Sequence, residues 1–223
     1  MTDPRVQAAA ALERFLVANN IDAMLATVAN RQSVEPQIRR YLESNPLVPL
    51  DYQSLTISNG AGPTGERAIV ITLKDGTQRE ANVVREDGRS VVDWPSFVAW
   101  SDMEWAHFMD KKPAEPILFR VIAEAEQRYD NAFADPKKLA CLKLINPRDT
   151  TAHPLYAYVE RSSIIGQEID VLMRQAEGRP TKLTLHLKYP AKATSQDQVW
   201  IDSVLASGWM VPRSKSTAQN TAR

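Results

Sequence analysis

The amino-acid sequence predicts an α+β fold with N-terminal helices and a mostly antiparallel sheet. Three observations support this prediction. Apolar side chains recur at helical spacing over the first 45 residues. Residues 53–93 then alternate apolar and polar side chains, with two Asp-Gly pairs between the alternating runs. Helical and strand segments come in separate blocks, which is typical of α+β proteins.

The N-terminal block predicts three helices. Asp3 is expected to cap the first, and Pro4 suits its first turn. One face of this helix carries the apolar residues Val6, Ala9, Leu12, Phe15 and Leu16. A shorter helix is predicted over 21–28, and Ser33 is expected to cap the third.

The next block predicts strands joined by tight turns. A strand over 53–57 precedes a glycine-rich loop, whose spacing matches no phosphate-binding motif. The Asp75-Gly76 and Asp87-Gly88 pairs then separate three further runs. Because Asp-Gly favours two-residue hairpin turns, these runs predict a three-stranded antiparallel meander.

Two short helices are predicted after the meander. Asp93 is a candidate cap for the first, which reaches Trp100. Ser101 and Glu104 have the spacing of a capping box and predict the second.

The last hundred residues return to strands and include one more helix. Ser162-Ser163 is expected to cap this helix, which closes near Gly178. In the strand over 183–189, strict alternation predicts a polar face turned to water. The strands are predicted over 117–124, 139–145, 155–160, 183–189 and 199–205.

This element order is interpreted as a single α+β domain over 4–211. The alternative is two sub-domains, 4–92 and 93–211. Residues 212–223 lack apolar periodicity and are expected to form a disordered tail.

Composition excludes several classes of protein. Lys plus Arg and Asp plus Glu each number 27, and this zero net charge argues against a nucleic-acid partner. The single cysteine, Cys141, excludes a disulfide framework and a cysteine-rich zinc site, and its apolar surroundings predict burial. No apolar run reaches the ~18 residues of a membrane span. We expect a cytoplasmic protein, or a periplasmic or membrane-tethered one if an N-terminal anchor has been removed.

The sequence contains no motif that specifies catalysis, a cofactor or a metal site. The three histidines are widely separated, so none of them forms a local zinc-binding pair. Asp93 and His107 flank an aromatic segment and are the candidate general bases.

The aromatic segment is the most informative feature for function. Five aromatic residues fall within fifteen positions: Trp94, Phe97, Trp100, Trp105 and Phe108. They form either part of the hydrophobic core or the wall of a ligand pocket or partner groove. For the second case, the candidate binding residues are Trp94, Trp100, Trp105, Arg120 and Tyr129.

Several segments resemble known proteins. Residues 14–18 and 34–41 resemble the opening of nuclear transport factor 2-like (cystatin-like) proteins. That resemblance implies helices packed on a curved antiparallel sheet that can enclose a pocket. Further segments resemble a family of uncharacterised bacterial proteins, namely 93–98, 128–133, 155–159 and 198–201. The superfamily includes enzymes and non-enzymes, so the resemblance implies a fold and no catalytic residue.

Three functions are compatible with these observations. The first is a non-enzymatic module that binds a protein partner or a small ligand. The second is a small pocket enzyme, of isomerase or hydrolase type, that uses Asp93 or His107. The third is a structural domain that self-associates through strand edges and tryptophan faces. Because no catalytic spacing is present, the first is favoured.

Overall fold

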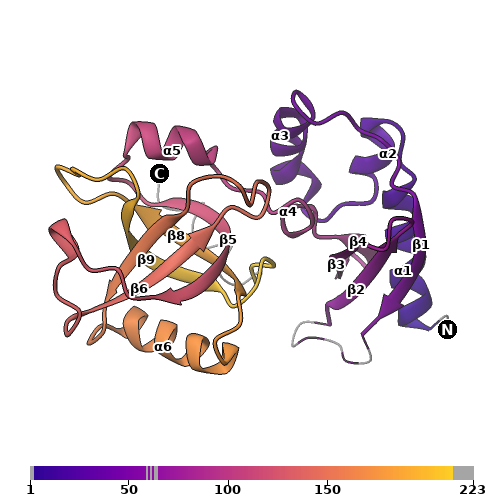
Figure 1. Ribbon diagram of the computed structural model, residues 1–223. Helices are drawn as coiled ribbons and strands as arrows, with labels where there is room; N and C mark the ends of the chain where they lie inside the picture. Colours follow the sequence, from indigo (N-terminus) through magenta and orange to yellow (C-terminus); the bar gives the residue numbers. More distant parts are fainter. Residues whose placement is uncertain (1–2, 59, 61, 63–64, 213–223) are drawn as a thin grey trace. The chain divides into compact units, whose positions relative to one another are not determined.

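The structure is a computed structural model that describes residues 3–58, 60, 62 and 65–212. The chain divides into two compact units, residues 1–98 and 99–223. Helices accompany a mostly antiparallel, curved sheet in each unit, so the predicted α+β class is confirmed (Figure 1). Apart from Pro212, the tail expected over 212–223 lies outside the described residues.

The first unit opens with three helices, α1 (Pro4–Leu16), α2 (Ile21–Leu25) and α3 (Arg31–Leu42). As predicted, the carboxylate of Asp3 caps α1 by accepting from the backbone N–H of Arg5 at 2.8 Å. Asn20 caps α2 in the same way. The prediction that Ser33 caps α3 is wrong. The helix starts directly after Asn30, whose left-handed backbone (φ 51°) reverses the chain there.

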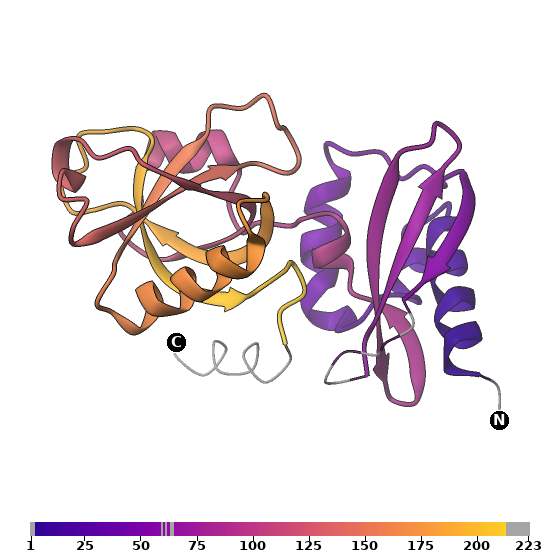
Figure 2. The same ribbon diagram turned by 60° about the horizontal axis from the view of Figure 1, so that its bottom comes forward.

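A four-stranded antiparallel sheet follows, formed in sequence order by β1 (Tyr52–Ile57), β2 (Arg67–Leu73), β3 (Gln78–Glu86) and β4 (Arg89–Val92). Figure 2 shows its strands side by side. Both Asp-Gly pairs lie in hairpin turns, as predicted, but only Asp87-Gly88 forms a two-residue turn, with φ of 48° and 78°. The first turn has a third residue, Lys74, and of its Asp-Gly pair only Gly76 has a positive φ, 82°. Helix α1 packs on β3 and β4, and the short helix α4 (Trp94–Phe97) completes the unit.

The second unit is built on a closed barrel of five strands, β5 (Ile117–Glu126), β6 (Leu139–Ile145), β7 (Leu155–Glu160), β8 (Thr181–Lys188) and β9 (Gln198–Ala206). Their order around the barrel is β5-β6-β7-β9-β8, and β8 pairs back with β5. Only the β7–β9 pair among these strands is parallel. A barrel with this strand order and a helix between its third and fourth strands has the topology of the OB fold.

Helices cover opposite sides of this barrel in Figure 1, α5 (Trp105–Lys111) on one side and α6 (Ile164–Ala176) on the other. A short 3₁₀ turn, η1 (Asn131–Phe133), lies in the β5–β6 loop. Ser163 caps α6 as predicted, because its hydroxyl accepts from the N–H of Gly166. The predicted capping box before α5 is wrong. Glu104 is the N-cap residue, and the hydroxyl of Ser101 instead accepts from the N–H of Arg120.

Alternating side chains of all five strands fill the barrel, which explains the period-two pattern of the sequence. Its interior is formed mainly by Phe119, Val121, Leu142, Leu144, Leu155, Ala157, Leu183, Leu185, Leu187 and Val199.

The outer face of β5 and β8 is covered by the chain itself. The prediction that β8 turns a polar face to water is wrong at Thr184, which is fully buried and donates to the carbonyl of Gly208 at 2.6 Å. Its partner on β5, Arg120, is 5% exposed. The Arg120 guanidinium donates from Nε to the carbonyl of Trp209 at 2.6 Å and from Nη1 to that of Trp100 at 2.7 Å.

Candidate functional site

The candidate general bases lie in different units. Asp93 is at the N-cap position of α4 in the first unit, where its side chain makes no capping bond. His107 is on α5 in the second unit, and its side chain is exposed. A catalytic role for either residue stays a prediction.

The three tryptophans named as binding residues are buried. Trp94 packs edge-on against Tyr41 in the first unit. In the second unit, Trp105 packs against Phe119 and donates from its indole N–H to the carbonyl of His153 at 2.9 Å. The carbonyl of Trp100 accepts from Arg120, as described above. These placements are those of core residues, and ligand contact by them stays a prediction.

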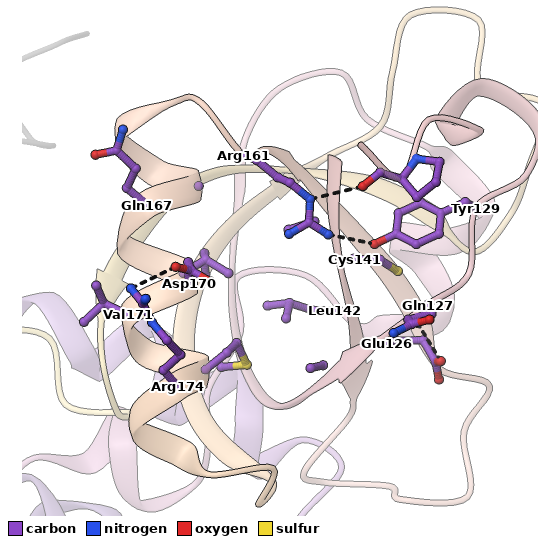
Figure 3. A pocket seen from close by; sticks show the side chains of 16 residues that line it. Glu126, Gln127, Tyr129, Cys141, Leu142, Arg161, Gln167, Asp170, Val171 and Arg174 are labelled. Carbon is purple, nitrogen blue, oxygen red and sulfur yellow. Dashed lines mark hydrogen bonds and ion pairs between the residues drawn. The ribbon is translucent and has the colours of Figure 1, made fainter. Parts of the chain in front are cut away.

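A pocket of about 880 Å³ lies in the second unit, between α6 and the adjoining ends of β5 and β6 (Figure 3). Of the predicted binding residues, Tyr129 lines it. Its apolar part is formed by Ala125, Ala140, Leu142, Ile169 and Met173. Charged and amide side chains surround this apolar part, namely Glu126, Gln127, Arg161, Gln167, Asp170 and Arg174.

The sequence builds the pocket through the way α6 begins. Gly166 is buried in the first turn of α6, where an added Cβ would lie 2.0 Å from the carbonyl oxygen of Glu160. Only glycine therefore lets the helix start this close to the end of β7. Helix α6 packs on β7 and β9, and the pocket opens on the β5–β6 side.

Arg161 is the residue that gives the pocket its chemistry. Its Nε donates to the carbonyl of Pro136 at 3.2 Å, and its Nη2 donates to the hydroxyl of Tyr129 at 3.3 Å. Figure 3 shows its guanidinium between α6 and the ring of Tyr129. The two charged residues of α6 that line the pocket pair with each other, Arg174 with Asp170 at 2.9 Å.

Cys141 forms part of the pocket wall and is 4% exposed, which confirms the predicted burial. Burial raises the pKa of its thiol. Because the thiolate is the reactive form, this cysteine is held in its unreactive, protonated state at neutral pH.

A polar network next to the pocket joins three loops of the barrel. At its centre, the carboxylate of Asp197 is 8% exposed. It accepts from Arg128 Nη1 at 2.6 Å and from the hydroxyl of Ser195, and it lies 3.2 Å from Nε2 of His153. Burial alone would raise the pKa of Asp197, but hydrogen bonds from Ser195, Arg128 and His153 outweigh it and hold the pKa below its ordinary value.

We expect Asp197→Asn to lower the free energy of unfolding of the second unit by about 1–3 kcal/mol at pH 7. The contribution of a carboxylate with a lowered pKa is complete above its unfolded pKa, near ~3.9, and is lost as the pH falls through the folded value. Urea titrations at pH 7 and pH 3 measure the difference in the free energy of unfolding between Asp197→Asn and the wild type. This difference should be smaller at pH 3. Asp110→Asn, at an exposed site on α5, is the control. An equal difference at both pH values would contradict the role of the ionised Asp197 carboxylate in stabilising the second unit.

The aromatic side chains on the outer face of β7 and β9 are covered by the β5–β6 loop. Phe133 of this loop stacks on Tyr158, with ring centroids 4.0 Å apart and planes 12° from parallel, and meets Trp200 edge-on. Arg128 lies 4.2 Å above the ring of Tyr156.

Comparison of the chain with protein-family models, curated proteins and solved structures finds no match. In the described part of the chain, no helix combines the length and apolar character needed to cross a bilayer. The same residues contain no group of three or more His, Cys, Asp or Glu side chains arranged to hold a metal ion.

Sequence reasoning found Tyr129 and missed the rest of the pocket. Its lining comes from residues 125–142 and 161–174, and no pattern in the sequence pairs these segments. Two signals were present. A glycine stands in the first turn of a predicted helix, and an arginine directly precedes the Ser162-Ser163 cap. The glycine indicates that the first turn of the helix packs closely against another segment, and the arginine places a positive charge beside that turn.

Proposed function

We propose that the second unit is a non-enzymatic module that binds a small organic ligand in the pocket between α6 and the β5–β6 strands. The observation that carries the proposal is the pocket itself. Its volume of about 880 Å³ falls in the ~300–1,000 Å³ range of small-molecule sites. Such sites also combine apolar side chains with polar groups that fix the orientation of the ligand, and this lining has both.

The chemistry of the lining favours binding over catalysis. Nucleophilic catalysis needs a nucleophile beside a general base. The one thiol in the lining, Cys141, is buried with a raised pKa. Among the described lining residues, Arg161 and Arg174 bond to a carbonyl, a phenol and a carboxylate, which are contacts that fix geometry. A pocket enzyme using Asp93 or His107, and a self-associating domain, remain the alternative hypotheses.

For the first unit we propose the nuclear transport factor 2-like (cystatin-like) superfamily, as the sequence resemblance implies. The packing of α1 on a four-stranded antiparallel sheet supports this proposal. A shared fold would leave its function open.

A thermal-shift screen of small acids, amines and neutral compounds tests the pocket. A ligand that binds only the folded state at about 100 times its Kd stabilises it by about 2.7 kcal/mol. We expect at least one compound to raise the melting temperature saturably and to slow the alkylation of Cys141, the only cysteine, in moderate urea.

The variant Ala125→Phe should fill the pocket and abolish both effects, because Ala125 lies in its wall. The matched control is Ala106→Phe, at an exposed position on α5. Stabilisation that survives Ala125→Phe would place the ligand elsewhere and refute the proposal.

A further inference from the structure

We infer that the ligand of this pocket is an amphipathic organic acid, a single carboxylate on an apolar body, with the carboxylate held by Arg161. This inference rests on the proposed small-ligand function of the second unit. It follows from three features of the lining: one guanidinium bonded to neutral oxygens, an ion pair between the two charged lining residues of α6, and apolar side chains in the wall.

Arg161 has more N–H donors than its two side-chain hydrogen bonds use. A guanidinium carries five N–H donors in a fixed fork. The bonds to the Pro136 carbonyl and the Tyr129 hydroxyl use Nε and Nη2. Both acceptors are neutral, and no carboxylate of the described residues forms an ion pair with Arg161. Arg161 is exposed, so a ligand carboxylate can reach it and form charge-assisted hydrogen bonds, which are the stronger kind.

The bonds of Arg161 also orient it. The Pro136 carbonyl and the Tyr129 ring belong to the β5–β6 loop, whereas Arg161 directly follows β7. The guanidinium is therefore fixed between two segments of the pocket wall (Figure 3). Because its geometry is set before the ligand arrives, less side-chain entropy is lost on binding.

The remaining charges limit the ligand to one anionic group. Asp170 and Arg174 pair with each other on α6. Glu126 lies at the end of β5, and its carboxylate accepts from the backbone N–H of Gln127 at 2.8 Å. A second anionic group near Glu126 would meet like charge, which is unfavourable.

The rest of the lining suits a hydrocarbon body. Leu142 and Ile169 lie at the base of the pocket, already covered by the protein, whereas Ala140 and Met173 are partly exposed and can contact a ligand. The flexible thioether of methionine adapts to ligands of different shape. Burial of apolar ligand surface here would contribute to affinity, and Arg161 would select the head group.

Calorimetric titration of the full chain with octanoate, 1-octanol and octylamine tests the inference, because these probes share a chain and differ in head charge. We expect octanoate to bind about tenfold or more tightly than the other two. Arg161→Gln should remove that advantage and leave 1-octanol binding unchanged, and Arg161→Lys should restore part of it. Higher salt should weaken octanoate alone.

Two variants serve as controls for Arg161→Gln. Arg179→Gln removes an exposed, already paired arginine that lies outside the pocket lining, so octanoate affinity should stay within about twofold. Tyr129→Phe removes the hydrogen bond between Arg161 and the Tyr129 hydroxyl but keeps the positive charge of Arg161. This variant should keep the preference for octanoate over octylamine.

The outcomes separate the two proposals. If none of the three probes binds and none protects Cys141 from alkylation, the small-ligand function itself is refuted. If 1-octanol or octylamine binds as tightly as octanoate, or if Arg161→Gln leaves octanoate binding intact, the pocket stands and the organic-acid inference is overturned.

Discussion

Replacing Gly166 by alanine should destabilise the second unit by about 2 kcal/mol or more, although alanine is the better helix former by about 1 kcal/mol. The reason is steric. A Cβ at this position would lie 2.0 Å from the carbonyl oxygen of Glu160, and 3.0 Å from the Cα of Arg161. Both are backbone atoms, so relief requires α6 to move away from the end of β7. Such overpacking typically costs about 1–3 kcal/mol.

Urea unfolding followed by tryptophan fluorescence measures this effect, because most of the tryptophans belong to the second unit, namely Trp100, Trp105, Trp200 and Trp209. The control is Glu168→Ala, at an exposed site on the same helix, which should change stability by less than about 0.5 kcal/mol. If both variants unfold at the same urea concentration, the claim that α6 starts too close to the end of β7 for any residue but glycine is contradicted.

The second large effect is expected at Arg120. Arg120→Met keeps most of the side-chain volume and removes the donors to the carbonyls of Trp100 and Trp209. Leaving buried acceptors unpaired costs about 1–3 kcal/mol each, so we expect a loss of about 3 kcal/mol in the free energy of unfolding. The same urea titration measures it.

Lys143→Met is the matched control for Arg120. Lys143 also projects outward from the barrel, and its ion pair with Glu124 is about one-third exposed on each side. Surface pairs of this kind contribute about 0–1 kcal/mol.

The sequence analysis named Arg120 as a binding residue. A purely structural role predicts that Arg120→Met lowers stability while the folded fraction keeps its affinity for octanoate. A loss of affinity without a loss of stability would instead support contact with the ligand.

The sequence predicted the local structure well because local rules decided it. Asp87-Gly88 forms the turn that the φ preferences of the two residues favour, Gly76 takes the positive φ of the first turn, and Asp3 and Ser163 cap their helices. The cap at Ser101 was mispredicted because a competing partner was available. Ser101 accepts a hydrogen bond from β5, a contact across 19 positions that no helix-start rule includes.

The barrel and its pocket could not be predicted, because they depend on pairing between distant strands. Alternation in β7 and β9 indicates two strands, but nothing in either segment says that they run parallel and close a barrel. The burial of Thr184 follows from residues 207–212 folding over β8, which strand periodicity cannot reveal. The pocket lining depends on the same long-range closure.

The parallel β7–β9 pair has a consequence for how the molecule forms during synthesis. Strand β9 is the last of the barrel, and it pairs with both β7 and β8. The barrel therefore stays open on the ribosome until residues 198–206 have emerged, with the edges of β7 and β8 exposed meanwhile. The sheet of the first unit pairs only consecutive strands, so it can fold while the rest is translated. Refolding of the full chain should accordingly show a fast phase from the first unit and a slower one from barrel closure.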